Sequence, residues 1–177
     1  LATQHTLGMK VQLAHLIDID LGAFRNRVVL SVGSHEGVQV GQVVIDAHGI
    51  MGQVIEVLPT TCVAMLITDP AHAVPVTDER TGVRAVAYGS RMDGQLSLPN
   101  IPVSVDMRAG DTLVTSGLGG RFPQGFPVGT VRSIETDASG MYLHAWATPA
   151  AELQRSGDVL LLRDLAQPAG APGPPPS

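Results

Sequence analysis

Cysteine, aromatic residues and charge are all scarce in this chain. Cys62 is the only cysteine among 177 residues, so no intrachain disulfide can form, and we expect it to be a small buried apolar residue. Aromatic residues make up 3%, so a core must be built from the aliphatic residues that dominate the 44% hydrophobic fraction. Charged residues make up 15% and the net charge is -5, which argues against nucleic-acid binding because such proteins need a basic surface.

Long apolar runs are also missing. No stretch of about 18 apolar residues occurs, so the sequence predicts no transmembrane helix in this piece. No signal peptide is visible either. Because the first residue is Leu1 rather than methionine, we expect a piece of a longer protein, in which residues 1–8 are the stump of an upstream segment.

Clusters of reactive side chains are not apparent. We expect His35, His48 and His72, which lie in turn segments, to be solvated, and no two histidines have the spacing with which a zinc site could begin. Ser116 precedes Gly117 in a glycine-rich loop, but the G-x-S-x-G turn is absent. The sequence therefore predicts no catalytic residue, no metal and no cofactor. A trypsin-like peptidase stays possible as an alternative, because the members of a Ser-His-Asp triad can be far apart in sequence.

What the chain does contain is a series of short apolar runs separated by turn signals. About a dozen such runs with few helical patterns indicate an all-β sandwich or barrel. The expected strands are Lys10–Ile19, Arg27–Val32, Gly41–Asp46, Ile50–Leu58, Cys62–Thr68, Ala73–Thr77, Val83–Tyr88, Gln95–Leu98, Thr112–Thr115, Val128–Ile134, Met141–Trp146 and Asp158–Leu162.

A spacing pattern occurs twice along the chain. Residues 38–57 and 107–134 each hold an apolar–Gly–apolar strand followed by a Gly-x-Val-x-x-apolar strand. The repetition predicts two small six-stranded β-barrels in tandem, residues 9–72 and 73–148, although such patterns can also recur by chance. Residues 156–163 could return to complete the first barrel. Closing a sheet on itself removes its exposed edges.

Glycine and proline are concentrated in two places. The segment 106–131 is glycine-rich, and we expect its glycines to shape a loop, with positive φ at Gly119 and Gly129. The tail 166–177, AQPAGAPGPPPS, has no periodic apolar face and is expected to be disordered. The glycines assigned to the structural loop are Gly117, Gly119, Gly120, Gly125 and Gly129.

A small group of aromatic residues provides the candidate binding site. In the expected strand at 141–146, Tyr142, His144 and Trp146 share one face, because side chains alternate along a strand. Aromatic side chains with polar tips are favoured at protein interfaces. Phe122 and Phe126 flank a Pro-x-Gly turn and are further candidates. Each of these residues could instead fill a barrel, and a ligand-binding barrel is a third possible function.

The glycine-rich segment also carries a long, specific motif. It is Gly110-Asp111-x-Leu113-Val114-Thr115-Ser116-Gly117-Leu118-Gly119-Gly120-x-Phe122-Pro123-x-Gly125-x-Pro127-Val128-Gly129-x-Val131. Shorter motifs precede it in order, among them Gly49-x-x-Gly52-x-Val54 and Leu66-Ile67-Thr68-Asp69. Over residues 10–163 the chain resembles the MreC family of bacterial rod-shape-determining proteins.

This resemblance implies a fold and a function. Members of the family have a transmembrane helix, a coiled coil that dimerises, and two periplasmic β-barrels arranged distantly like those of trypsin, without known catalysis. The resemblance therefore implies a non-enzymatic scaffold of cell elongation, anchored to the inner membrane by a helix absent from this chain. The expected partners are the elongation-specific class B penicillin-binding protein, MreD, cytoplasmic MreB and further copies of the protein itself.

Overall fold

The computed structural model describes residues 10–22, 24–90, 94–152 and 157–163. The expected stump at 1–8 and the expected disordered tail at 166–177 lie outside these residues. Twelve β-strands and two single-turn 3-10 helices, Ser34–Glu36 and Leu118–Gly120, make up the regular structure of the described residues. The prediction of an all-β chain folded as two barrels is confirmed.

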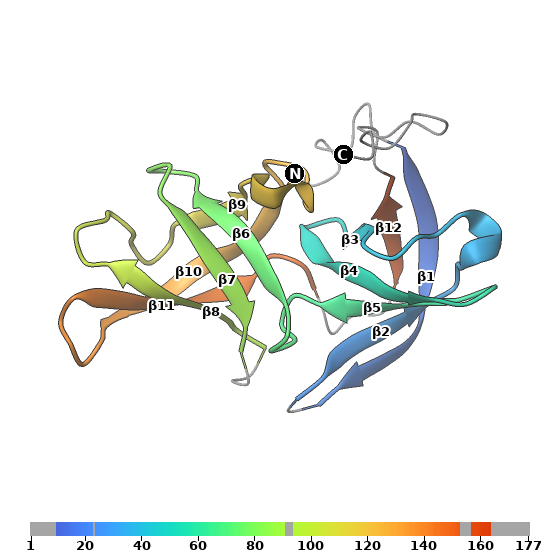
Figure 1. The fold of residues 1–177 in the computed structure, drawn as a ribbon, viewed down its shortest axis with the longest axis horizontal. Coiled ribbons are helices and arrows are strands. Elements are labelled where there is room, and N and C mark those ends of the chain that lie inside the picture. The colour runs from blue at the N-terminus through green and yellow to red at the C-terminus, as the bar shows by residue number, and fades with distance from the viewer. Residues whose placement is uncertain (1–9, 23, 91–93, 153–156, 164–177) are drawn as a thin grey trace, which may run out of the picture.

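The strands form two closed six-stranded barrels, which lie side by side in Figure 1. The first barrel has the cyclic order β1-β12-β3-β4-β5-β2 and the second has the order β10-β11-β8-β7-β6-β9. The first barrel is made of β1 (Val11–Leu21), β2 (Asn26–Leu30), β3 (Val43–Ile45), β4 (Ile50–Val57), β5 (Cys62–Leu66) and β12 (Asp158–Leu162). The second is made of β6 (Ala73–Asp78), β7 (Arg84–Gly89), β8 (Leu96–Pro102), β9 (Thr112–Thr115), β10 (Pro127–Thr136) and β11 (Tyr142–Pro149).

The chain passes twice between the barrels. It crosses from β5 to β6, builds the whole second barrel, and returns from β11 to β12. The returning strand β12 pairs antiparallel with β1 on one side and with β3 on the other, and so closes the first barrel. The first barrel therefore depends on pairing between the two ends of the described chain.

Aliphatic side chains fill both barrels. On β5 the alternate residues Cys62, Ala64 and Leu66 are fully buried, whereas the residues between them are half-exposed. Burial raises the pKa of the Cys62 thiol to about 11, which leaves it protonated and unreactive at neutral pH. On β11 the same alternation buries Ala145 and Ala147 completely. One face of each strand is thus committed to a core, and function is left to the outer faces and the loops.

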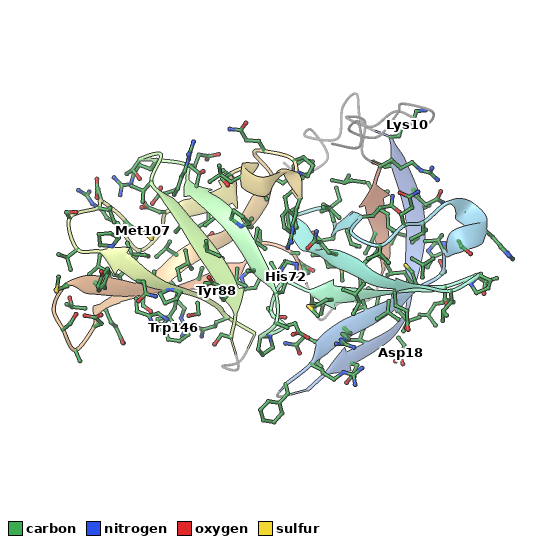
Figure 2. The ribbon with its side chains drawn as sticks, viewed as in Figure 1. Lys10, Asp18, His72, Tyr88, Met107 and Trp146 are labelled. Atoms are coloured by element: carbon green, nitrogen blue, oxygen red, sulfur yellow. The ribbon has the colours of Figure 1, made fainter. Side chains whose placement is uncertain are left out.

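His72 contacts both barrels at their junction. His72, in the β5–β6 crossing, is 5% exposed, so the expectation that it is solvated is wrong. Its Nε2 lies 3.1 Å from Gln53 Oε1 of the first barrel. Its ring meets the edge of Phe122 of the second barrel, with ring centroids 5.8 Å apart. Figure 2 labels His72 between the two barrels.

The glycine-rich segment forms the turns between β9 and β10. Gly117, Gly119, Gly120 and Gly125 all have positive φ, between 70° and 91°, in the left-handed region that favours glycine. Gly129 differs from the expectation, because it lies within β10 and has no positive φ. A Cβ there would lie 2.6 Å from the carbonyl oxygen of Thr148 on β11. Gly129 is therefore suited to close approach of two strands rather than to a turn.

Candidate functional site

The outer face of β11 carries the three aromatic residues that the sequence singled out. Tyr142 is 39% exposed, and His144 and Trp146 are half-buried, whereas the alanines that alternate with them are fully buried. This alternation points the three aromatic side chains away from the barrel interior. The sequence left open whether this face fills a barrel, and the structure places it on the outside.

His144 is held in place by two neighbours. Its ring stacks on the ring of Trp146, with centroids 4.4 Å apart and planes inclined by 20°. Its Nε2 shares a hydrogen bond with Ser97 Oγ on the adjacent strand β8, at 2.7 Å. A side chain fixed by stacking and by a hydrogen bond loses little conformational freedom when a partner binds, which favours affinity.

Sequence reasoning missed a fourth member of this face, Tyr88 on β7. Tyr88 is 42% exposed and is in register with Ser97, which on its other side is in register with Trp146. Figure 2 labels Tyr88 and Trp146 on the second barrel. We call the set Tyr88, Ser97, Tyr142, His144 and Trp146 the aromatic face. It holds both tyrosines and the single tryptophan of the chain.

Two other predicted binding residues are corrected by the structure. Phe122 is 3% exposed and Phe126 is 1% exposed, so neither side chain presents a surface to a partner. Both belong to the core beneath the glycine-rich segment. The backbone N–H of Phe126 donates a hydrogen bond to Thr115 Oγ1, at 2.9 Å, which ties the end of this segment to β9. Their role is to anchor the loop rather than to bind.

The pair Ser97–His144 has the first contact of a catalytic triad, so its surroundings decide whether it can act as one. A nucleophilic serine needs a histidine that is itself oriented by a carboxylate. Glu135 of β10 is in register with His144, but among the described residues no carboxylate hydrogen-bonds to the His144 ring, which stacks on Trp146. The loop serine Ser116 contacts no histidine there, and its Oγ accepts a hydrogen bond from the Leu118 N–H. Neither Ser97 nor Ser116 therefore belongs to a triad in the described part of the chain.

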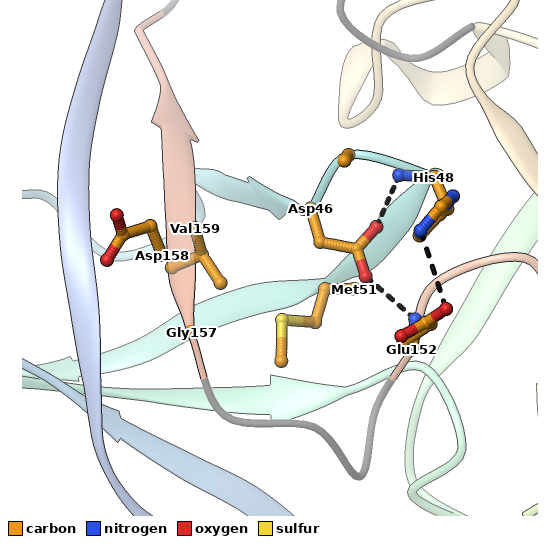
Figure 3. A pocket seen from close by; sticks show the side chains of 8 residues that line it. Asp46, His48, Met51, Glu152, Gly157, Asp158 and Val159 are labelled. Atoms are coloured by element: carbon orange, nitrogen blue, oxygen red, sulfur yellow. Dashed lines mark hydrogen bonds and ion pairs between the residues drawn. The ribbon is translucent and has the colours of Figure 1, made fainter.

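A hollow of about 160 Å³ lies beside the first barrel, lined by residues that include Asp46, His48, Glu152 and Asp158 (Figure 3). Drug-sized ligands occupy pockets of roughly 300–1,000 Å³. Asp46 accepts hydrogen bonds from the backbone N–H groups of His48, Gly49 and Glu152, at 2.7–3.0 Å. Its carboxylate thus fastens the return from β11 to the first barrel, and the hollow does not support the ligand-binding alternative.

The described residues contain no group of three or more histidine, cysteine or acidic residues that could hold a metal ion. None of their helices has the length and apolar character needed to cross a membrane. The site with the clearest binding character is therefore the aromatic face.

The fold and the candidate site define a protein of two closed β-barrels with an aromatic face on the outside of the second. The model of the family described as "Rod shape-determining protein MreC, barrel core" matches residues 16–163. The chain belongs to the MreC family of cell shape-determining proteins.

Individual relatives agree with this assignment. The chain is 42% identical over 151 residues to the cell shape-determining protein MreC of Haemophilus influenzae. The matched region covers 85% of this chain and 43% of that protein. It is 43% identical over 139 residues to the Escherichia coli protein of the same name. Here the matched region covers 78% of this chain and 38% of that protein. The chain thus spans less than half the length of these two relatives.

Solved structures show the same fold. The crystal structure of MreC from Pseudomonas aeruginosa superimposes with a TM-score of 0.83 at 42% identity, over 87% of this chain and 99% of that one. A second neighbour comes from a complex between penicillin-binding protein PBP2 and MreC of Helicobacter pylori. It has a TM-score of 0.66 and 20% identity, over 87% of this chain and 97% of that one, and so supports the fold alone.

Proposed function

We propose that this chain is the barrel part of a non-enzymatic scaffold of the bacterial cell-elongation machinery, and that it binds a class B penicillin-binding protein. The partner docks on the aromatic face. The protein works in the periplasm, and its upstream part anchors it to the inner membrane. It acts alongside MreD, connects to cytoplasmic MreB and associates with further copies of itself.

The closure of both barrels limits where a partner can bind. A partner commonly adds a strand to an exposed sheet edge, but the two closed barrels leave few such edges, among them residues 84–87 of β7, which are not paired with β8. The outer faces of strands and the loops are therefore the larger surfaces that the described residues offer to a partner. The aromatic face is the outer surface on which tyrosine and tryptophan, the residue types enriched in binding hot spots, come together.

The observation that carries the proposal is the position of Trp146. Its side chain points out of the barrel on β11, stacks on His144, and lies across Ser97 from the exposed Tyr88. Rigid aromatic groups of this kind supply a large contact area at a small cost in side-chain entropy. The penicillin-binding protein as partner is supported by membership of a family in which such a complex has been solved.

The test compares two variants of the full-length protein in binding to the elongation-specific penicillin-binding protein. Trp146→Ala should weaken binding by roughly 30-fold or more, the effect of losing a hot spot worth about 2 kcal/mol. The control is Ile17→Ala, which removes an apolar side chain that is 56% exposed on the first barrel. If Trp146→Ala and Ile17→Ala bind the penicillin-binding protein equally well and keep their thermal stability, the aromatic face is not the docking site. Binding of this partner at another surface would then still be tested by the same measurement.

A further inference from the structure

A pair of buried carboxyl groups lies at one end of the second barrel, away from the aromatic face. Asp78, the last residue of β6, is fully buried, and Asp111, just before β9, is 7% exposed. Asp78 Oδ1 accepts a hydrogen bond from the backbone N–H of Arg80, at 3.0 Å. Asp78 Oδ2 is buried and has no hydrogen-bond donor in the described part of the chain. Asp111 lies close by, because Asp78 is in register with Leu113 of β9 and the N–H of Glu79 donates to the carbonyl of Thr112, at 2.9 Å.

The hydrogen bonds around Asp111 decide which of the two carboxyls is ionised. Its Oδ1 accepts from Arg80 Nε at 2.8 Å, and its Oδ2 accepts from Arg80 Nη2 at 3.0 Å and from the Arg108 N–H at 2.9 Å. Arg80 also binds Asp106, with Nη1 and Nη2 at 3.0 and 3.2 Å from its two carboxylate oxygens. The guanidinium is thus committed to Asp111 and Asp106, and it offers no side-chain donor to Asp78.

Two carboxylates cannot hydrogen-bond each other without a proton between them. A buried carboxylate oxygen without a donor destabilises the fold, and a second buried negative charge beside it adds repulsion. We propose that Asp78 and Asp111 share one proton, and that this proton acts as a latch between the β6–β7 turn and the β8–β9 connection. Loss of the proton loosens the latch.

The latch joins two segments that are otherwise separated in the chain. Asp78 shapes the β6–β7 turn, since its backbone N–H donates to the carbonyl of Val83 and its carbonyl accepts from the N–H of Gly82, at 2.8 and 2.7 Å. Asp111 shapes the β8–β9 connection through the Arg108 N–H. A proton between these carboxyls therefore affects the local stability of both segments.

Burial and, after it, the neighbouring Asp111 carboxyl raise the pKa of Asp78 from 3.8 to about 6. The Arg80 guanidinium holds the pKa of Asp111 well below its usual range. The charged groups that face Asp78 are Asp111 and Arg80, while Asp106 acts on it only through Arg80. Because folding raises the pKa of Asp78, its stabilising contribution is complete below about pH 4. That contribution is lost as the pH rises through about 6.

A second group titrates in the same range with the opposite sign, so the test must be a difference between variants. Folding lowers the pKa of His72 from 6.5 to about 4, and the contribution of His72 to stability therefore grows as the pH rises over that interval.

Asp78→Asn supplies an amide N–H to Asp111 at every pH and so imitates the protonated carboxyl. Urea unfolding of the whole chain measures the unfolding equilibrium constant of each protein. The constant of Asp78→Asn divided by that of the wild type should fall at least tenfold between pH 4.5 and pH 7.5.

The matched control is Asp106→Asn, which removes an exposed carboxylate from the same arginine but leaves the buried pair in place. It should keep the wild-type dependence of stability on pH over this range. A direct readout follows the side-chain carboxyl carbon of Asp78 by ¹³C NMR in the wild-type chain, where a midpoint near pH 6 is expected. A midpoint below pH 4.5, or the same pH dependence in Asp78→Asn and wild type, would overturn the shared proton.

Discussion

Tyr88 and Trp146 lie two strands apart in the second barrel, and both are in register with Ser97 on the strand between them. Neighbouring strands are about 4.8 Å apart, so the two aromatic side chains leave the sheet about 10 Å from each other. The small Ser97 side chain lies between them and binds His144. The two large aromatic groups and the small polar residue between them thus lie on one outer surface of the second barrel.

Tyr88 is the member of the aromatic face that the sequence did not predict. Its contribution to binding is therefore tested by variants of its own. Tyr88→Ala should weaken binding to the penicillin-binding protein by about tenfold, since it removes an exposed aromatic contact worth about 1.4 kcal/mol. Tyr88→Phe keeps the ring and should retain most of the affinity. Isothermal titration calorimetry with both variants decides, and an alanine variant that binds as wild type would restrict the face to β11.

Two glycines of the same segment should respond differently to a methyl group. In Gly129→Ala the new Cβ would lie 2.6 Å from a backbone oxygen, so we expect a loss of about 3 kcal/mol through overpacking. Gly119 has a φ of 80° and open space around its Cβ position, so Gly119→Ala should cost only about 1 kcal/mol of backbone strain. Urea unfolding measures both, and the reverse order would contradict the roles assigned to them.

The strands could be predicted from the sequence because alternating apolar residues between turn signals are a local property. The predicted runs Ile50–Leu58 and Asp158–Leu162 match β4 and β12 to within one residue. Gly129 shows where local reasoning fails, because its lack of a side chain is required by Thr148 on a strand that pairs with it. Nothing near Gly129 in sequence distinguishes close approach from a turn.

The candidate site could be predicted only in part. Tyr142, His144 and Trp146 alternate on one strand, so their common face is visible in the sequence. Tyr88 could not be added, because its place beside Trp146 follows from the strand order β11-β8-β7. Whether Phe122 binds or fills the core could not be decided, because a loop has no alternation from which to tell its buried from its exposed residues.

His72 should titrate far below an ordinary histidine. Burial lowers its pKa from 6.5 to about 4, against the attraction of Asp69 and with a small contribution from Arg121. Because folding favours the neutral ring, the stability that depends on it is complete above about pH 6.5 and is lost as the pH falls through about 4. The midpoint of its Hε1 signal by ¹H NMR checks this, and a value near 6.5 would contradict a buried ring at the junction.

The pair Ser97–His144 should be chemically inert despite its hydrogen bond. Because no carboxylate of the described residues hydrogen-bonds to His144, we expect the serine hydroxyl not to be activated. A fluorophosphonate probe should leave the folded chain unmodified in mass spectrometry, with active trypsin as the positive control. Stoichiometric modification of Ser97 would support the peptidase alternative.

Trp146 is the only tryptophan among these 177 residues, so it reports on the aromatic face without interference from other positions of the chain. The chain labelled with 5-fluorotryptophan should give a single ¹⁹F NMR resonance. Addition of unlabelled elongation-specific penicillin-binding protein should shift or broaden that resonance in a saturable manner as the partner covers the ring. An unchanged resonance under conditions where calorimetry shows the complex to be saturated would contradict docking on the aromatic face.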